Sequence, residues 1–163
     1  LILYKNQKIK SYDIKNLKNP DLIIIDTGPK KSTAKMVLHV SKLYEKNKQK
    51  TEQIFKEIEN CCNIGLRYLF RNNMEEFGNQ MYKNHNLLNK LGVSTIKLNK
   101  AVLLSKLNKA YGAKLSGGGG GGIAIAFINK NKTNYLIKIL KNNNFNAFKL
   151  KVTQIGAKFY NGE

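Results

Sequence analysis

Six consecutive glycines, Gly117 to Gly122, are the part of this sequence best suited to contact a ligand through the backbone. Short, largely apolar stretches flank the run, Ala113 to Ser116 before it and Ile123 to Phe127 after it, and both have the pattern of strands. A flexible linker is the alternative, but it has no reason to be fixed by a strand on each side. Glycine allows positive φ and exposes successive N–H groups without a Cβ, which suits a phosphate group. We therefore predict a phosphate-binding loop.

Two familiar nucleotide-binding motifs do not fit this run. Gly117, Gly119 and Gly122 satisfy the GxGxxG pattern, as any six glycines would, but a dinucleotide fold needs a helix next and a strand pattern follows here. A P-loop needs a lysine after its last glycine, and Ile123 stands in that place. Neither motif is present.

A second candidate is the triplet Asp26-Thr27-Gly28, which follows the apolar run Leu22 to Asp26. Aspartic proteases use this triplet to supply their paired aspartates, but their fold is all-β and a long helical region follows here. The alternative is a strand-to-helix turn, after which Lys30, Lys31, Ser32 and Thr33 open a helix. Helix N-termini attract anions, so a carboxylate or phosphate ligand fits this position.

The histidines and cysteines suggest no further chemistry. His39 and His85 have no acidic or sulfur partner at ligand spacing, so we expect surface or packing residues and no metal site. Cys61 and Cys62 are adjacent and are spaced neither as metal ligands nor as a disulfide framework. We expect them to be buried thiols in a reducing compartment.

The composition favours one cytoplasmic globular domain. The chain has 163 residues, 42% of them hydrophobic, and no run of the roughly 18 apolar residues that a membrane helix needs. Its net charge of +19 could indicate nucleic-acid binding, but Arg67 and Arg71 are the only arginines among 29 basic residues, and base readout favours arginine. We expect no nucleic-acid and no membrane partner, and we keep a basic nucleic-acid-binding module as the alternative of another class.

The elements that must position the glycines follow an α+β order. Hairpin strands are predicted within Leu1 to Ile9, and further strands at Leu22 to Asp26, Ala113 to Leu115, Ile123 to Ile128 and Phe145 to Val152. Helices are predicted from a cap at Ser32 or Thr33, then over Thr51 to Phe70, Met74 to Leu91, Ile96 to Tyr111 with Gly112 as the stop, and Lys132 to Lys141. This order predicts a ferredoxin-like antiparallel sheet covered by helices on one face. The hairpin suggests a fragment, so we divide the chain into residues 1–18, a remnant hairpin and linker, and residues 19–163.

Four segments together resemble mevalonate kinases, in family order. They are DTGPKKSTAKMV (Asp26 to Val37), FGNQMYKNHNLLNKLGVST (Phe77 to Thr95), GAKLSGGGGGGIAIAF (Gly112 to Phe127) and NNFNAFKLKVTQIGAKF (Asn143 to Phe159). The glycine segment is typical of the whole GHMP kinase superfamily, and the segment Lys83 to Ser94 narrows the resemblance to mevalonate kinases. Gly118 departs from the alanine common in that motif, and Ile123 and Ala124 replace its usual Cys-Gly.

The resemblance implies the C-terminal domain of a kinase that phosphorylates mevalonate with ATP and Mg²⁺ in isoprenoid synthesis. Ser116 and Gly117 to Gly121 correspond to the cofactor-binding motif, and Lys31, Ser32 and Thr33 to the triplet facing the mevalonate pocket. The catalytic aspartate and the magnesium ligand of the family lie in the N-terminal domain, so we expect neither here. That domain is the expected partner, and a homodimer remains open. Phosphomevalonate kinase and mevalonate diphosphate decarboxylase are the alternatives within the superfamily.

Overall fold

The computed structural model describes residues 2–5, 8–11, 20–29 and 32–150. Its strands are β1 (Ile2–Lys5), β2 (Lys8–Ser11), β3 (Asp21–Asp26), β4 (Gly112–Ser116), β5 (Ile123–Ile128) and β6 (Asn146–Leu150). Its helices are α1 (Thr33–Lys46), α2 (Lys48–Phe70), α3 (Met74–Lys90), α4 (Ile96–Leu107) and α5 (Thr133–Asn142), with a 3-10 turn, Lys130–Lys132, before α5. The predicted α+β class is confirmed.

Four antiparallel strands form the main sheet, in the order β4-β5-β3-β6. β3 lies inside the sheet, where Ile23 is opposite Ala126 of β5 on one side and Lys149 of β6 on the other. Strands distant in sequence are therefore neighbours, as in a ferredoxin-like sheet, and α1 to α4 take the place of its first helix. This confirms the predicted plan.

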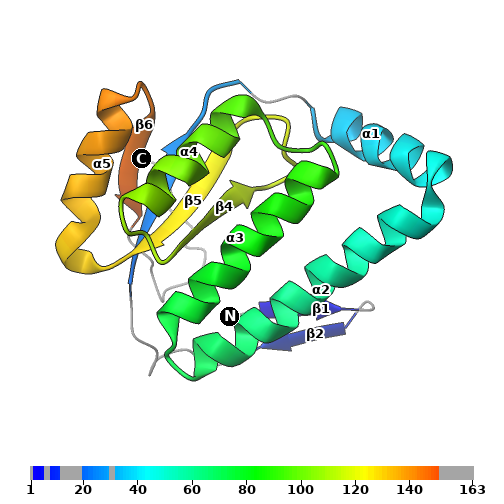
Figure 1. Ribbon diagram of the computed structural model, residues 1–163, viewed down its shortest axis with the longest axis horizontal. Helices are drawn as coiled ribbons and strands as arrows, with labels where there is room; N and C mark the ends of the chain where they lie inside the picture. Colours follow the sequence, from blue (N-terminus) through cyan, green and yellow to red (C-terminus); the bar gives the residue numbers. More distant parts are fainter. Residues whose placement is uncertain (1, 6–7, 12–19, 30–31, 151–163) are drawn as a thin grey trace, which may run out of the picture.

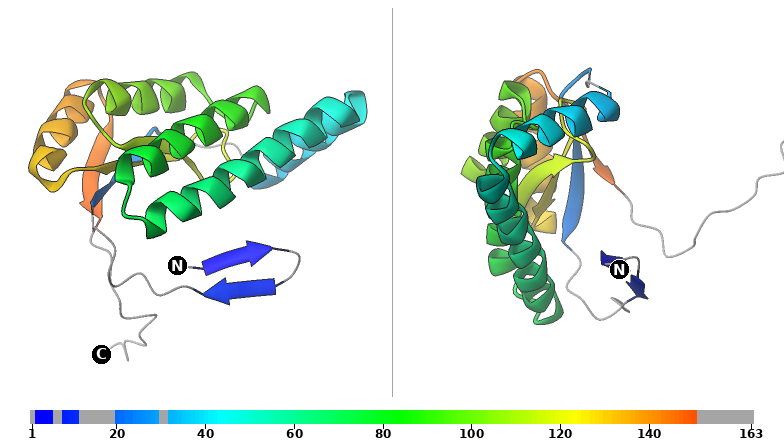
Figure 2. Two further views of the ribbon diagram at one scale, coloured as in Figure 1. Left: turned by 60° about the horizontal axis from the view of Figure 1, so that its bottom comes forward. Right: turned by 90° about the vertical axis from the view of Figure 1, so that its right-hand side faces the viewer.

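The helices cover one face of the sheet. Figure 1 shows α4 lying over β4 and β5 and α5 beside β6, and the edge-on view in Figure 2 shows the helices on one side. Side chains alternate between the faces of a strand, so Ile23 and Ile25 point to the helices and are fully buried. Ile24, from the same strand, and Phe148 of β6 lie on the other face, where Phe148 is 47% exposed. At β3 and β6 the sheet therefore has one covered and one open face.

Helix α3 packs against the edge strand β4 at backbone distance. A Cβ atom on Gly78 of α3 would lie 1.8 Å from the carbonyl oxygen of Tyr111, and one on Gly112 would lie 2.5 Å from the Cα of Gly78. The Tyr82 hydroxyl of α3 donates a hydrogen bond to the Ala110 carbonyl at 3.1 Å. The missing side chains let the helix cover the edge of β4, which would otherwise expose unpaired backbone groups.

Helix α4 ends at Leu107 and not at Tyr111, so the predicted C-terminus is wrong. Lys109 adopts the left-handed conformation, with φ of 65°, and the chain turns there without a glycine. Gly112 was predicted to stop the helix but belongs to β4. Gly112 is needed because Gly78 of α3 approaches its backbone closely, and the sequence around Gly112 does not reveal this approach.

The remaining elements lie within a few residues of their predictions. Ser32 caps α1 as expected, since its hydroxyl accepts a hydrogen bond from the Lys35 N–H. The last strand begins at Asn146, one residue later than predicted, and its predicted end at Val152 falls outside the described residues. β1 and β2 pair as the predicted hairpin, and the assignment of residues 1–18 to another domain stays a prediction. None of the helices in the described ranges is long and apolar enough to cross a membrane.

Candidate functional site

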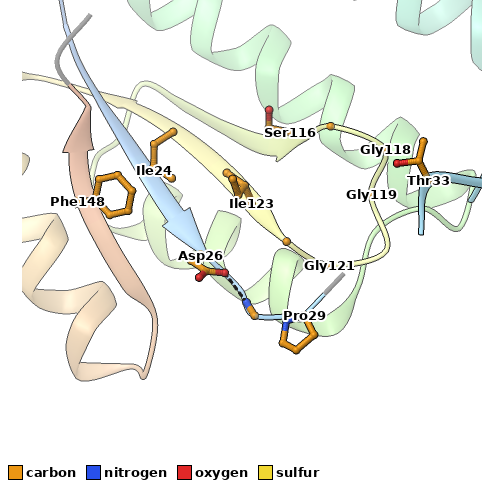
Figure 3. A pocket seen from close by; sticks show the side chains of 13 residues that line it. Ile24, Asp26, Pro29, Thr33, Ser116, Gly118, Gly119, Gly121, Ile123 and Phe148 are labelled. Atoms are coloured by element: carbon orange, nitrogen blue, oxygen red, sulfur yellow. Dashed lines mark hydrogen bonds between the residues drawn. The ribbon is translucent and has the colours of Figure 1, made fainter. Parts of the chain in front are cut away.

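The glycine run borders a pocket at the end of the sheet. The pocket has a volume of about 540 Å³, and Figure 3 shows the side chains around it. It is lined by Ile24, Asp26, Gly28, Pro29, Thr33, Ser116, Gly117, Gly118, Gly119, Gly121, Gly122, Ile123 and Phe148. One wall is therefore apolar sheet surface, and the opposite wall is backbone.

The glycines form the connection between β4 and β5, in a conformation that side chains rarely adopt. Gly117, Gly119, Gly120, Gly121 and Gly122 all have positive φ, between 74° and 115°. Such backbone is accessible to glycine at no steric cost and can form a concavity of N–H groups that suits an anion. The run joins two paired strands, which rules out a flexible linker between independent parts.

The loop is anchored to the connection between α3 and α4. The Gly120 N–H donates a hydrogen bond to the Val93 carbonyl at 2.7 Å, and a Cβ on Gly119 would lie 2.2 Å from the same oxygen. Gly119, Gly120 and Gly121 are buried. These three residues are therefore packed against the rest of the domain and are not part of a solvent-exposed loop.

The Asp26-Thr27-Gly28 triplet forms the predicted strand-to-helix turn and holds the other end of the loop. The Thr27 hydroxyl and the Thr27 N–H both donate hydrogen bonds to the Gly122 carbonyl, at 2.8 Å and 2.7 Å, and the Gly122 N–H donates to the Gly28 carbonyl. The Asp26 carboxylate accepts a hydrogen bond from the Gly28 N–H at 2.8 Å. Asp26 therefore serves the turn, and the triplet contributes loop anchoring.

The start of α1 brings one hydroxyl residue to the glycine loop. A Cβ atom on Gly118 would lie 3.2 Å from the Thr33 Cγ2, and Figure 3 shows Thr33 beside Gly118 at the pocket. Ser32 does not line the pocket, because its hydroxyl caps the helix. Lys31 lies outside the described residues.

Most of the predicted cofactor-binding residues share this pocket. Ser116, Gly117, Gly118, Gly119 and Gly121 line it together with Thr33. Gly120 does not, since it turns its N–H to Val93. The apolar wall of Ile24 and Phe148 was missed, although the alternation of buried and half-buried positions along β3 could have placed Ile24 on the open face.

Two further hollows meet the pocket at Gly117. An apolar groove of about 510 Å³ lies between α1, α2 and the loop. A third hollow of about 470 Å³ lies between α2, α3 and the open face of β4 and β5, and Cys61, Cys62 and Lys114 contribute to it. Burial raises the pKa of the Cys61 thiol and lowers the pKa of Lys114. Cys62 is exposed, so the expected burial of both thiols is wrong for this one.

The described residues do not form a magnesium site. Within the described ranges no three His, Cys, Asp or Glu side chains gather where they could hold a metal ion. The one carboxylate that lines the pocket, Asp26, is used by the turn. Gly117, Gly119, Gly121 and Gly122 line the pocket with positive-φ backbone, a conformation that can bind an anion through its N–H groups.

Comparisons with known proteins show which family this chain resembles. A family model described as GHMP kinases C terminal matches residues 66–154. The mevalonate kinase of Methanocaldococcus jannaschii is 37% identical over 149 residues, which are 91% of this chain and 45% of that protein. The mevalonate kinase of Methanothermobacter thermautotrophicus is 36% identical over 106 residues, 65% of this chain and 35% of that protein. The chain thus spans less than half of these relatives.

Solved structures show the same fold. The crystal structure of L. major mevalonate kinase in complex with R-mevalonate superposes with a TM-score of 0.79 at 27% identity, covering 86% of this chain and 44% of that one. The mevalonate kinase of Methanococcus jannaschii superposes with a TM-score of 0.78 at 35% identity, covering 91% and 45%. The resemblance found in the sequence is confirmed, and the chain belongs to the GHMP kinases, with the fold of their C-terminal domain.

Proposed function

We propose that this chain is the C-terminal part of an ATP-dependent mevalonate kinase, which transfers a phosphoryl group to the primary hydroxyl of mevalonate. The observation that carries the proposal is the pocket in which Thr33 and Ser116 meet the positive-φ glycine loop. The similarity to mevalonate kinases over 91% of the chain supports the choice of substrate.

In this proposal this chain positions the phosphate groups and the substrate, and an N-terminal domain supplies the groups that take part in the reaction. ATP, when bound, supplies the phosphoryl group, and the loop from Gly117 to Gly121 forms the phosphate-side wall. Ser116 and Thr33 offer hydroxyl groups on either side of that wall, where they would orient phosphate or substrate oxygens. The catalytic base and the ligands of Mg²⁺ would come from an N-terminal domain, the proposed partner.

The proposal predicts that residues 1–163 alone do not phosphorylate mevalonate, since phosphoryl transfer needs its base and metal partners. The test is a chimera in which this chain replaces the matching 45% of the Methanocaldococcus jannaschii enzyme. We expect ATP-dependent phosphorylation of mevalonate by the chimera and none by the chain alone. A folded chimera that binds ATP but turns over no mevalonate would contradict the proposal.

The alternatives within the superfamily are separated by the acceptor. A structure of phosphomevalonate kinase superposes with a TM-score of 0.72, but at 18% identity it speaks for the fold alone. The chimera should therefore be assayed with mevalonate, phosphomevalonate and mevalonate diphosphate. Preference for either phosphorylated compound would favour phosphomevalonate kinase or the decarboxylase instead.

A further inference from the structure

His85 is a buried histidine that uses both ring nitrogens. It lies on α3, is 4% exposed, and accepts a hydrogen bond at Nδ1 from the Leu115 N–H at 3.2 Å. Because Nδ1 is an acceptor, the proton of the neutral ring is on Nε2, which donates to the Asn99 Oδ1 at 3.0 Å. The two contacts fix the tautomer and the orientation of the ring.

The Leu115 N–H needs this partner because β4 is an edge strand. β4 pairs with β5 alone, and α3 covers its other edge, so a backbone donor pointing outward is buried beneath the helix. A buried N–H without an acceptor is unfavourable, and His85 supplies the acceptor. Leu115 directly precedes Ser116, where the glycine loop begins.

The far side of the His85 ring is held by a polar network. The Asn99 Oδ1 also accepts a hydrogen bond from the Ser94 hydroxyl at 2.7 Å, and the Asn99 Nδ2 donates to the Asn89 Oδ1 at 3.1 Å. Ser94 follows Val93, whose carbonyl accepts the Gly120 N–H. The same connection thus holds the loop at two points, through His85 before the glycines and through Val93 within them.

We propose that His85 is a positioning residue for the glycine loop: it fixes the end of β4 and thereby places Ser116 and Gly117 at the phosphate side of the pocket. Its importance for catalysis rests on the proposed function, whereas its hold on the loop does not. The residue would act through Leu115, because it is not among the residues that line the pocket.

The protonation state of His85 determines whether its Nδ1 can accept the hydrogen bond from the Leu115 N–H. A protonated ring carries a hydrogen on Nδ1, which would then face the Leu115 N–H donor to donor. Lys114 of β4 is the charged group that acts on the ring, and Asn99 of α4 and Ser94 of the connection are uncharged. Burial lowers the pKa of His85, Lys114 lowers it further, and the Asn99 hydrogen bond opposes the shift. The ring is therefore neutral at neutral pH, and the loop is held.

Two amide substitutions separate the two contacts of the ring. In His85→Asn the side-chain oxygen takes the place of Nδ1 and can accept from Leu115, but it cannot reach Asn99. In His85→Gln the terminal amide takes the place of Nε2 and loses the contact with Leu115. Asn86→Ala, at an exposed neighbouring position of α3, is the control for changes to the helix.

The test is amide hydrogen exchange of the 163-residue chain, followed by NMR at Leu115 and Gly120. We expect exchange at Leu115 to be at least about 10-fold faster in His85→Gln than in His85→Asn or Asn86→Ala, after correction for global stability. In the unsubstituted chain, protection at Leu115 relative to global unfolding should fall as the pH drops through the lowered pKa of His85, below its ordinary 6.5, and the ring takes up its proton. This second measurement needs no variant to fold.

Equal protection of Leu115 in the two variants, or protection independent of His85 protonation, would overturn the positioning role. In the chimera, His85→Gln should raise the ATP Michaelis constant at least about 5-fold, and His85→Asn should restore most of it. An inactive chimera in which Leu115 exchange follows His85 would count against the proposed function and leave the positioning role standing.

Discussion

Gly119 and Val93 approach each other so closely that a Cβ on Gly119 would lie 2.2 Å from the Val93 carbonyl oxygen. Gly117 has nearly the same φ, 79° against 78°, yet nothing lies within 4 Å of its Cβ position. The two glycines therefore share a left-handed φ and differ in the space around them. Substitutions at these two positions therefore measure the cost of a left-handed φ separately from the cost of a steric clash.

We expect Gly117→Ala to lower the free energy of unfolding by about 1 to 2 kcal/mol, the usual cost of a left-handed alanine. Gly119→Ala carries the same conformational cost and also displaces the Val93 carbonyl, so its loss should be at least about 2 kcal/mol larger. Urea denaturation of the isolated chain measures both values. Equal losses would mean that the loop moves away from Val93 at little cost.

The contact between α3 and β4 makes a second prediction about glycine. Alanine at an interior helix position normally stabilises by about 1 kcal/mol relative to glycine. At Gly78 the new Cβ would lie 1.8 Å from a backbone oxygen, so we expect Gly78→Ala to destabilise by about 3 kcal/mol or more.

Gly65 of α2 is the matched control, because its nearest contact would be an ordinary 3.5 Å to the Gln80 Cβ. Gly65→Ala should therefore be neutral or slightly stabilising. A Gly78→Ala chain as stable as Gly65→Ala would refute the close packing of α3 on β4.

These glycines show where sequence reasoning stops. Strand β5 was predicted with its observed bounds, because an apolar run between turn residues is a local signal. Gly78 is also visible in the sequence, but a glycine is needed there because of the close approach of β4, a strand that follows much later in the chain. The prediction of the end of α4 failed for a similar reason, since Lys109 adopts the left-handed conformation that glycine usually provides at the end of a helix. Local pattern predicts elements, whereas distances between backbones need the fold.

A third prediction concerns the buried carboxylate at the start of β3. The Asp21 carboxylate accepts hydrogen bonds from the Thr133 hydroxyl at 2.7 Å and from the Lys149 ammonium at 2.8 Å. Burial raises the pKa of Asp21, but the bonds from Lys149 and Thr133 outweigh it and lower the pKa from its ordinary 3.8. The resulting stability is present above pH 3.8 and is lost as the pH falls through the lowered value.

Thr133→Val removes the hydroxyl at nearly constant volume, so we expect a loss of about 1.5 to 3 kcal/mol at pH 7. The loss should shrink in acid below the Asp21 pKa, where the carboxylate is neutral. Thr133→Ser keeps the hydroxyl and should show a smaller, pH-independent loss. Denaturation at pH 7 and over a series of pH values below 3.8 tests this, and a Thr133→Val loss that does not change with pH would exclude the ionic contribution.

A fourth prediction tests the substrate side of the pocket in the chimera. Thr33→Val removes the hydroxyl beside Gly118, so kcat/KM for mevalonate should fall at least about 10-fold, equivalent to roughly 1.4 kcal/mol. Asn47→Ala removes the cap of α2, whose Oδ1 accepts from the Lys50 N–H, and should cost about 1 kcal/mol of stability with no change in kcat/KM. Similar kcat/KM values for Thr33→Val and Asn47→Ala would show that the Thr33 hydroxyl does not contribute to the site.

The site was predicted in part for the same physical reasons as the fold. The glycines and Thr33 were predicted as site residues because special backbone and helix N-termini leave a mark in the sequence, and Thr33 lines one pocket with all of these glycines except Gly120. His85 was expected to be an ordinary surface or packing residue, because its partners Leu115 and Asn99 come from other elements. A single buried histidine gives no local sign of the backbone donor that it serves.

The open face of the sheet has a consequence for how the isolated chain behaves in solution. Ile123, Phe148 and Leu150 are 43%, 47% and 39% exposed, so two copies could bury apolar surface by stacking these faces. Each copy carries a net charge of +19, whose mutual repulsion opposes such contact. Added salt shortens the reach of that repulsion to about 8 Å at 0.15 M, and sulfate salts also strengthen apolar association. Sedimentation should therefore find monomers at low ionic strength and reversible self-association as salt rises, the opposite of a charge-driven complex.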